Sequence, residues 1–112
     1  MRAVLVNEGE GCIEEIELDI SPARNEIFQI LGGPGTFIGQ WPRTDVVIMK
    51  CAASRRTRVK NQNVLRPPFN DEVVMGPILM LRMDKDAEHQ DLTLEECLEK
   101  GLVSMPSPQE PH

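Results

Sequence analysis

Two apolar runs in the second half of the chain constrain the fold most. The run from Asp45 to Cys51 contains Val46-Val47-Ile48-Met49, which is apolar on both faces of an extended chain. Such a run is typical of a central strand that is covered on both sides. The run from Val73 to Met83 is equally apolar, but Gly76-Pro77 interrupts it, and a proline there removes a ladder donor and predicts a bulge or bend. The sequence therefore predicts two buried strands.

The first twenty residues predict a hairpin. Ala3 to Val6 is a short apolar strand, and the glycines at positions 9 and 11 suit the turn that follows it. In the returning strand, from Cys12 to Leu18, apolar and acidic residues alternate, so opposite faces carry opposite chemistry. The inward side comprises Ile16, Leu18 and Ile20, and the side that faces water comprises Glu15, Glu17 and Asp19.

Two short helices are predicted from their end signals. Ser21 followed by Pro22 predicts the start of a helix over Ala23 to Leu31, which Gly32 ends. Thr93 followed by Glu96 is a capping box for a C-terminal helix that ends at Gly101. The expected apolar stripes are Ile27, Ile30 and Leu31 in the first helix, and Leu94, Cys97 and Leu98 in the second.

These elements predict an α+β fold. We expect a mixed, mostly antiparallel sheet of four to five strands, with two short helices packed on one face. Residues 1–103 are expected to form a single domain, and residues 104–112, which include three prolines, a disordered C-terminal tail. No regular element is predicted for residues 36–41 or 52–70, and residues 84–91 are expected to form an exposed turn.

The charges are distributed unevenly. The net charge is −6, with 18 acidic and 12 basic residues, yet six cations and no acid lie between Lys50 and Arg66. We call residues 50–66 the basic segment. Because guanidinium groups offer paired donors to phosphate and carboxylate, the predicted anion-binding residues are Arg55, Arg56, Arg58, Lys60 and Arg66. Neutral donors and acceptors in the same segment are Asn61, Gln62 and Asn63. The alternative is a solvated loop, or one that lies against an acidic strand.

The acidic residues of the second strand suggest a different role. Glu14, Glu15, Glu17 and Asp19 are predicted to form an acidic interaction face that imitates a phosphate backbone or docks a basic protein. Contact of this face with the basic segment of a neighbouring molecule would give a homo-oligomer.

Catalytic and metal-binding signatures are weak. The three cysteines are widely spaced, which fits neither a disulfide framework nor a zinc site and favours a reducing compartment. The only histidines are His89 in the predicted turn and His112 in the tail, so no nucleophile has an evident base. The spacing of Asp84, Asp86 and Glu88 resembles that of a calcium-binding loop. However, His89 occupies the position of the glycine that such a loop needs. We expect no catalytic residue, no metal and no cofactor.

Short stretches over roughly the first hundred residues carry a family resemblance: Ala3-Val4-Leu5-Val6-Asn7, Glu15-Ile16-Glu17-Leu18, Ile30-Leu31-Gly32-Gly33, Val46-Val47-Ile48-Met49 leading toward Asn63, Met75-Gly76-Pro77-Ile78-Leu79 and Leu92-Thr93-Leu94-Glu95-Glu96. In these the chain resembles a "domain of unknown function" family that is carried chiefly by bacteriophages, plasmids and other mobile elements. The resemblance implies a viral or mobile-element protein that acts inside a host cell, and a mixed sheet with helices packed on it. It implies no activity. Members usually have an acidic, glycine-containing turn where this chain has Ala52-Ala53-Ser54-Arg55-Arg56, so the basic segment is a local specialisation.

The sequence thus favours a non-enzymatic binding module. Its basic segment would engage nucleic acid, a nucleotide or an acidic protein. The alternative is an inhibitor or regulator of a host protein that acts through the acidic face, and a small enzyme is the third possibility. We expect a cytoplasmic protein, because the cysteines favour a reducing compartment. We expect no membrane partner, because no apolar run is long enough to span a bilayer, and no secretion signal, because the first residues resemble a strand rather than a signal sequence.

Overall fold

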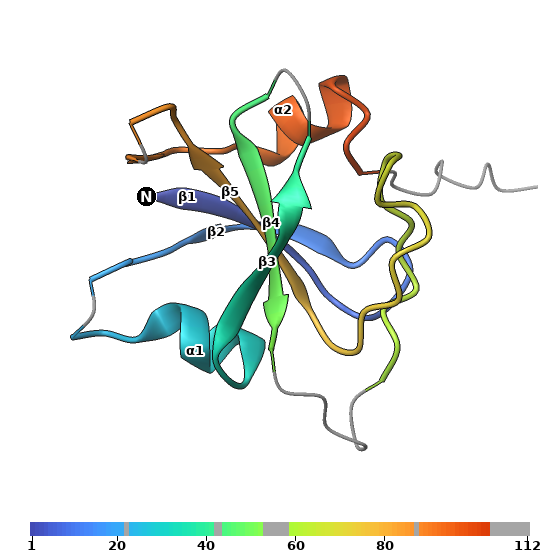
Figure 1. Cartoon of the computed structure of the whole chain (residues 1–112), viewed down its shortest axis with the longest axis horizontal. Helices are drawn as coiled ribbons and strands as arrows, with labels where there is room; N and C mark the ends of the chain where they lie inside the picture. The colour runs from blue at the N-terminus through green and yellow to red at the C-terminus, as the bar shows by residue number, and fades with distance from the viewer. Residues whose placement is uncertain (22, 42–43, 53–58, 87, 104–112) are drawn as a thin grey trace, which may run out of the picture.

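The structure is a computed structural model that describes residues 1–21, 23–41, 44–52, 59–86 and 88–103 (Figure 1). Its elements follow the chain in the order β1 (Arg2–Val6), β2 (Ile13–Glu17), α1 (Glu26–Leu31), β3 (Gly35–Gln40), β4 (Val46–Cys51), β5 (Ile78–Met83), β6 (His89–Gln90) and α2 (Leu94–Glu99). The predicted domain, 1–103, ends where the described residues end. The predicted tail, 104–112, lies outside the described residues.

Five strands form one sheet in the spatial order β2-β1-β5-β4-β3, and the short β6 pairs with the end of β5. Every pair among the described residues is antiparallel, so the predicted α+β class is confirmed and the sheet is antiparallel throughout rather than mixed. The first apolar run forms β4, whereas only the second half of the other run, Ile78–Met83, forms β5, and Val73 in its first half is 61% exposed. The strands β4 and β5 lie side by side in the interior of the sheet. The predicted break at Gly76-Pro77 lies just before β5 begins.

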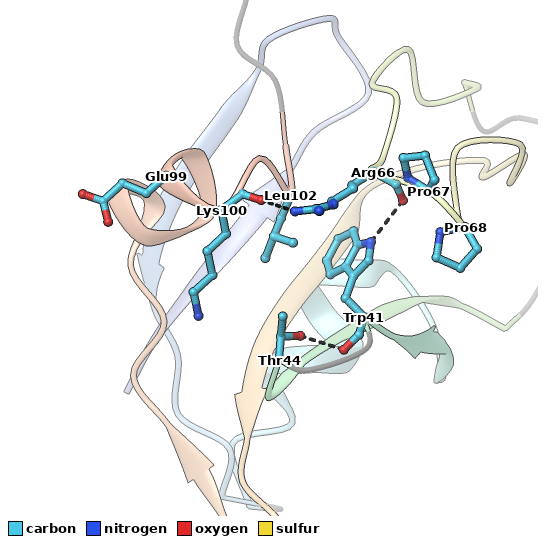
Figure 2. Close-up of a pocket in the computed structure, with 8 residues that line it drawn as sticks. All are labelled: Trp41, Thr44, Arg66, Pro67, Pro68, Glu99, Lys100 and Leu102. Carbon is cyan, nitrogen blue, oxygen red and sulfur yellow. Dashed lines mark hydrogen bonds between the residues drawn. The ribbon is translucent and has the colours of Figure 1, made fainter.

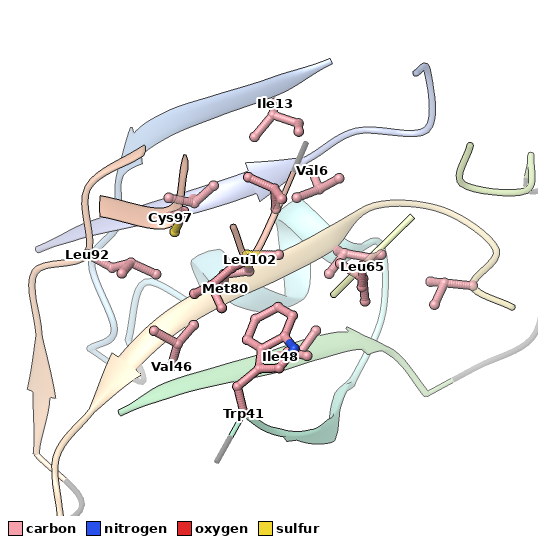
Figure 3. Packing of buried hydrophobic residues seen from close by; sticks show 14 residues of the cluster. Val6, Ile13, Trp41, Val46, Ile48, Leu65, Met80, Leu92, Cys97 and Leu102 are labelled. Atoms are coloured by element: carbon pink, nitrogen blue, oxygen red, sulfur yellow. The ribbon is translucent and has the colours of Figure 1, made fainter. Parts of the chain in front are cut away.

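The two helices lie on opposite faces of the sheet, not on one face as the sequence suggested. Leu31 of α1 packs in a cluster with Ala3, Met49 and Leu79. Cys97 of α2 packs in the other cluster, with residues of β1, β4 and β5 that alternate with the first set: Val4, Val6, Val46, Ile48, Ile78 and Met80 (Figure 3). The reason for the difference is that both inner strands are apolar on both faces, so each face needs its own cover.

Several local predictions differ from the structure at the ends of elements. The helix α1 begins at Glu26 rather than Ala23, because Asn25 before it is left-handed with φ 53°. The side chain of Ile20 is 41% exposed and that of Leu98 is 40% exposed, so neither belongs to the buried stripe predicted for it. In contrast, Gly32 ends α1 in the left-handed conformation with φ 76°, as expected.

The segment predicted to lack regular structure before β4 is an edge strand, β3. It pairs with β4 from Gly35↔Cys51 to Gln40↔Val47, with an irregularity between Phe37 and Gly39. Both described helices have six residues and are too short to cross a membrane.

Candidate functional site

The basic segment begins in β4, and its described residues from Val59 onward are held by an isolated bridge outside the named strands. At its first end, the N–H of Ala52 donates to the carbonyl of Pro34, at 2.7 Å. At its far side, Lys60 forms an antiparallel bridge with Met75, and the Gly76 N–H donates to the Val59 carbonyl at 2.8 Å. Arg55, Arg56 and Arg58 lie outside the described residues. The described residues on either side of these arginines, Ala52 and Val59, are therefore each held by a backbone hydrogen bond.

Two asparagines, Asn61 and Asn63, connect the end of the basic segment to other parts of the chain. We call this pair the asparagine clamp. The Asn61 amide nitrogen donates to the carbonyls of Val6 and Gly76, both at 3.0 Å, and Asn61 is only 6% exposed. The amide nitrogen of Asn63 donates to the carbonyls of Asn7 and Gly9, and its oxygen accepts from the Gly11 N–H. The clamp ties the tip of the β1–β2 hairpin to the chain before β5.

The clamp changes the interpretation of the neutral side chains in the basic segment. The sequence suggested that Asn61, Gln62 and Asn63 could contact a ligand. In the structure, all three amides bond to this chain's own backbone, Gln62 through the Lys60 carbonyl at 3.1 Å. Because the amide nitrogens of Asn61 and Asn63 each already have at least two acceptors, we assign these two residues a structural role.

The two described cations at the end of the basic segment are not brought together. Lys60 is exposed and lines a shallow depression of about 380 Å³ in which Asp71 and Glu72 are neighbours. Arg66 lines a different depression, of about 660 Å³, beside the end of α2 (Figure 2). A single ligand site that contains both cations is therefore not formed by these described residues.

Arg66 connects three parts of the fold. Its Nη1 donates to the carbonyl of Lys100 at 2.5 Å, just after α2. Its own carbonyl accepts from the indole Nε1 of Trp41 at 3.0 Å, and in Figure 2 the indole lies between Leu102 and Pro68. Sequence reasoning missed this arrangement, because its members are 25 and 34 residues apart and carry no shared motif.

The acidic residues of β2 do not form one face. Pairing places Glu15 opposite Val4 and Glu17 opposite Arg2, whereas Glu14 lies opposite Leu5 on the other face of the sheet. Several of the carboxylates also have internal partners. The oxygen of Glu15 accepts from the Leu94 N–H at the start of α2, at 3.0 Å.

Ion pairs engage two other carboxylates of this group, those of Glu17 and Asp19. Glu17 lies 3.6 Å from Arg2 Nε and 3.6 Å from the terminal ammonium. Asp19 lies 3.6 Å from Arg24 Nε, beyond the end of β2. The predicted acidic interaction face is therefore divided, and much of its charge is compensated within the molecule.

The thiol of Cys97 is enclosed where α2 meets the sheet. Burial raises the pKa of this thiol to about 11, although the cations of Arg82 and Lys100 favour its thiolate. Around it, Glu96 forms ion pairs with Arg82 and with Lys100. A raised pKa is the opposite of the activation that a nucleophilic cysteine needs.

The cysteines should consequently differ in their reactivity. At pH 8 we expect Ellman's reagent to label Cys12, which is exposed, within the first kinetic phase. Cys97 should react only when denaturant is added, because it is buried and stays protonated. The variant Cys12→Ser should lose the rapid phase, and rapid labelling of Cys97 in the native protein would contradict the structure.

In the sequence that resembles a calcium loop, the Asp84 carboxylate accepts hydrogen bonds from its own turn. Asp84 accepts from the N–H groups of Asp86 and Glu88, at 2.9 and 3.0 Å, and from the Gln90 amide at 3.2 Å. These hydrogen bonds, above all the one from Glu88, lower the pKa of the Asp84 carboxyl. Within the described part of the chain, no group of three His, Cys, Asp or Glu residues is placed to hold a metal ion.

Most of the chain matches one known protein family. Residues 4–99 match a family whose description is "Family of unknown function (DUF5880)". No curated protein and no solved structure matches the chain. The match covers both interior strands, the hairpin, the asparagine clamp and α2. The chain therefore belongs to this family of unknown function.

Proposed function

We propose that the protein is a non-enzymatic binding module that presents its basic segment to an anionic partner. The observation that carries the proposal is the anchoring of this segment at both ends. Residues 53–58, which contain three arginines, are preceded by a hydrogen bond from Ala52 to Pro34 and followed by the Lys60–Met75 bridge. Binding loops are commonly carried by a rigid scaffold in this way.

The second anchor is reinforced by the residues that follow Lys60. The asparagine clamp fixes residues 61–63 against β1 and the chain before β5. Because the clamp's amide donors are occupied, the binding energy would come from the cations that precede it. We therefore assign the anion contact to Arg55, Arg56, Arg58 and Lys60, and give Arg66 the positioning role at the end of α2.

The chemical class of partner follows from the charge. A phosphate-bearing ligand suits a cluster of guanidinium groups better than a carboxylate ligand does when the rest of the chain is acidic, since phosphate offers more negative charge per contact. Nucleic acid or a nucleotide is thus the first candidate, and an acidic protein is the second. We assign no catalytic role to Cys97, whose thiol pKa is raised by burial, or to Asp84, whose carboxylate accepts hydrogen bonds within its own turn.

Regulation of a host protein through the acidic residues ranks lower. Glu15, Glu17 and Asp19 are partnered by the start of α2, by Arg2 and by Arg24 respectively, so a docking protein would have to displace these contacts. An origin in a phage or another mobile element, and action in the cytoplasm of its host, remain part of this proposal.

Fluorescence anisotropy tests the proposal. Labelled single-stranded and double-stranded oligonucleotides and a labelled nucleotide are titrated with protein at low and near-physiological salt. We expect binding at low salt that weakens steeply as salt rises, because protein cations displace condensed counterions. The variant Arg55→Ala/Arg56→Ala should bind at least about tenfold more weakly, with a slope of log K against log salt reduced by about 2.

The matched control is Arg24→Ala/Lys85→Ala, which removes the same amount of charge from exposed positions outside the basic segment. It should bind nearly as well as the wild type. Absence of binding at low salt by any of these probes would reject nucleic acid and nucleotides as partners. Equal weakening in both double variants would show that net charge, rather than the basic segment, governs the affinity.

A further inference from the structure

The two edges of the sheet differ in chemistry. At one edge, β2 has the sequence Ile-Glu-Glu-Ile-Glu, so three of its five residues are charged. At the other edge, β3 reads Gly-Thr-Phe-Ile-Gly-Gln and contains no charged residue and no proline among its six. Charge and proline are the usual means by which an edge strand avoids pairing with another chain. The β3 edge lacks both.

One exposed side chain of β3 is also large and apolar. Phe37, at the middle of the strand, is 54% exposed, although a phenylalanine ring gains much from burial. Among the described residues β3 pairs only with β4, so its other edge is open in the part of the chain that the structure covers. The pairing is regular from Gly35 to Phe37, and the irregularity comes after Phe37.

We infer that β3 is a self-association edge, which pairs antiparallel with β3 of a second copy of this chain. A two-fold axis at Thr36 would pair the regular residues Gly35–Phe37 of the two copies, set the two Phe37 rings diagonally across the axis on one face, and extend the sheet across both molecules. This inference is independent of the anion-binding role proposed above.

The charges of the edge strands indicate which partner can pair with β3. Each copy carries a net charge of −6, which opposes association in general. Antiparallel pairing of β3 with itself nevertheless sets no charged residue of one strand opposite a charged residue of the other. Pairing of β2 with itself would instead bring glutamates of both copies together, which is destabilising. Of these two edges, β3 is therefore the one that can pair with its own copy without opposing charges.

The short regular part of β3 limits the strength of the contact. Only Gly35, Thr36 and Phe37 precede the irregularity, so the interface is small and the dimer should be weak and reversible. We expect a dissociation constant in the micromolar range or above. Because its contacts are backbone hydrogen bonds and apolar side chains, the dimer should persist when salt is raised.

A concentration series by sedimentation equilibrium or light scattering tests this inference. The wild type should change from monomer to dimer as its concentration rises, equally at low and high salt. Phe37→Lys should remain monomeric, because it replaces the apolar contact with two cations on either side of the axis. Folding of the variant is checked by circular dichroism and by the fluorescence of Trp41, the only tryptophan.

The matched control is Leu98→Lys, which replaces another exposed apolar residue on α2, the helix that contacts β2 at the opposite edge. It should dimerise like the wild type. Hydrogen exchange provides a second readout on the unmodified protein, since the amides of Gly35–Phe37 should be better protected at high concentration.

Two results would overturn the inference. One is a wild-type monomer at millimolar concentration. The other is a dimer that Phe37→Lys leaves intact and that salt dissociates, which would assign the contact to the basic segment and the acidic residues of a neighbouring copy.

Discussion

Replacing Asn61 with Asp should cause one of the largest losses of stability available in this fold. Asn61 donates two hydrogen bonds to the carbonyls of Val6 and Gly76 and accepts from Asn63, at a site that is 6% exposed. An ionised carboxylate would instead face two carbonyl oxygens with no donor to offer. We expect a loss of about 3 kcal/mol or more in the free energy of unfolding at pH 7.

The loss in Asn61→Asp should depend on pH with a defined sign. Burial against carbonyl oxygens disfavours the ionised form, so the pKa of the introduced carboxyl is raised in the folded state. The folded state then binds more protons than the unfolded state, and stability falls as pH rises above the unfolded pKa of about 3.9. Urea denaturation at pH 4 and pH 7 should therefore show the smaller deficit at pH 4.

A matched substitution controls for the change of amide to carboxylate. Gln62→Glu alters the adjacent, exposed amide, which bonds only to the Lys60 carbonyl within the segment. Its effect should stay within about 0.5 kcal/mol. A similar effect in both variants would mean that Asn61 is not the buried connection that the structure describes.

Truncation of Trp41 should have an effect of comparable size. Its side chain is 2% exposed, donates to the Arg66 carbonyl, and packs edge-to-face with Phe69 at a ring-centroid distance of 5.7 Å. Trp41→Ala opens a large cavity and leaves these partners without support, so it should cost about 3–5 kcal/mol. Denaturation followed by circular dichroism measures this, because the substitution removes the only tryptophan.

Two further variants separate the contributions of Trp41. Trp41→Phe keeps an aromatic ring but loses the indole donor, and its cost should be clearly smaller than that of Trp41→Ala. Val64→Ala truncates a side chain that is 66% exposed and should change stability little. If Trp41→Ala were as stable as Val64→Ala, the position of Trp41 in the core would be wrong.

Local sequence signals predicted the elements that neighbouring residues alone specify. The apolar runs of β4 and β5, the alternation in β2 and the Thr93 cap are each readable from neighbouring residues, and Thr93 does accept from the Glu96 N–H, at 3.2 Å. The strand β3 was missed because its two glycines weaken the local strand signal. Only its pairing with β4 makes it a strand. One glycine has a tertiary role, since a Cβ at Gly39 would lie 2.7 Å from the Phe69 ring.

The arrangement of helices and the candidate site depended on contacts that a sequence does not display. Two apolar faces on the interior strands could have indicated a helix on each side, but helix amphipathicity does not state which face a helix covers. The asparagines of the basic segment were predicted as possible ligand contacts because amides bind ligands and backbone equally well. Their acceptors, Val6 and Asn7, are more than fifty residues away along the chain.

The asparagine clamp also specifies how the strands align. Asn61 requires the carbonyls of Val6 and Gly76 to lie within reach of one amide group, and this geometry coincides with the alignment of Val6 opposite Ile78. A slip of β1 along β5 by one residue would move the Val6 carbonyl away and turn every side chain of β1 to the other face. Since both faces of β1 are apolar, burial alone discriminates poorly between these alignments. A single buried amide therefore supplies selectivity among competing strand pairings that the hydrophobic core does not provide.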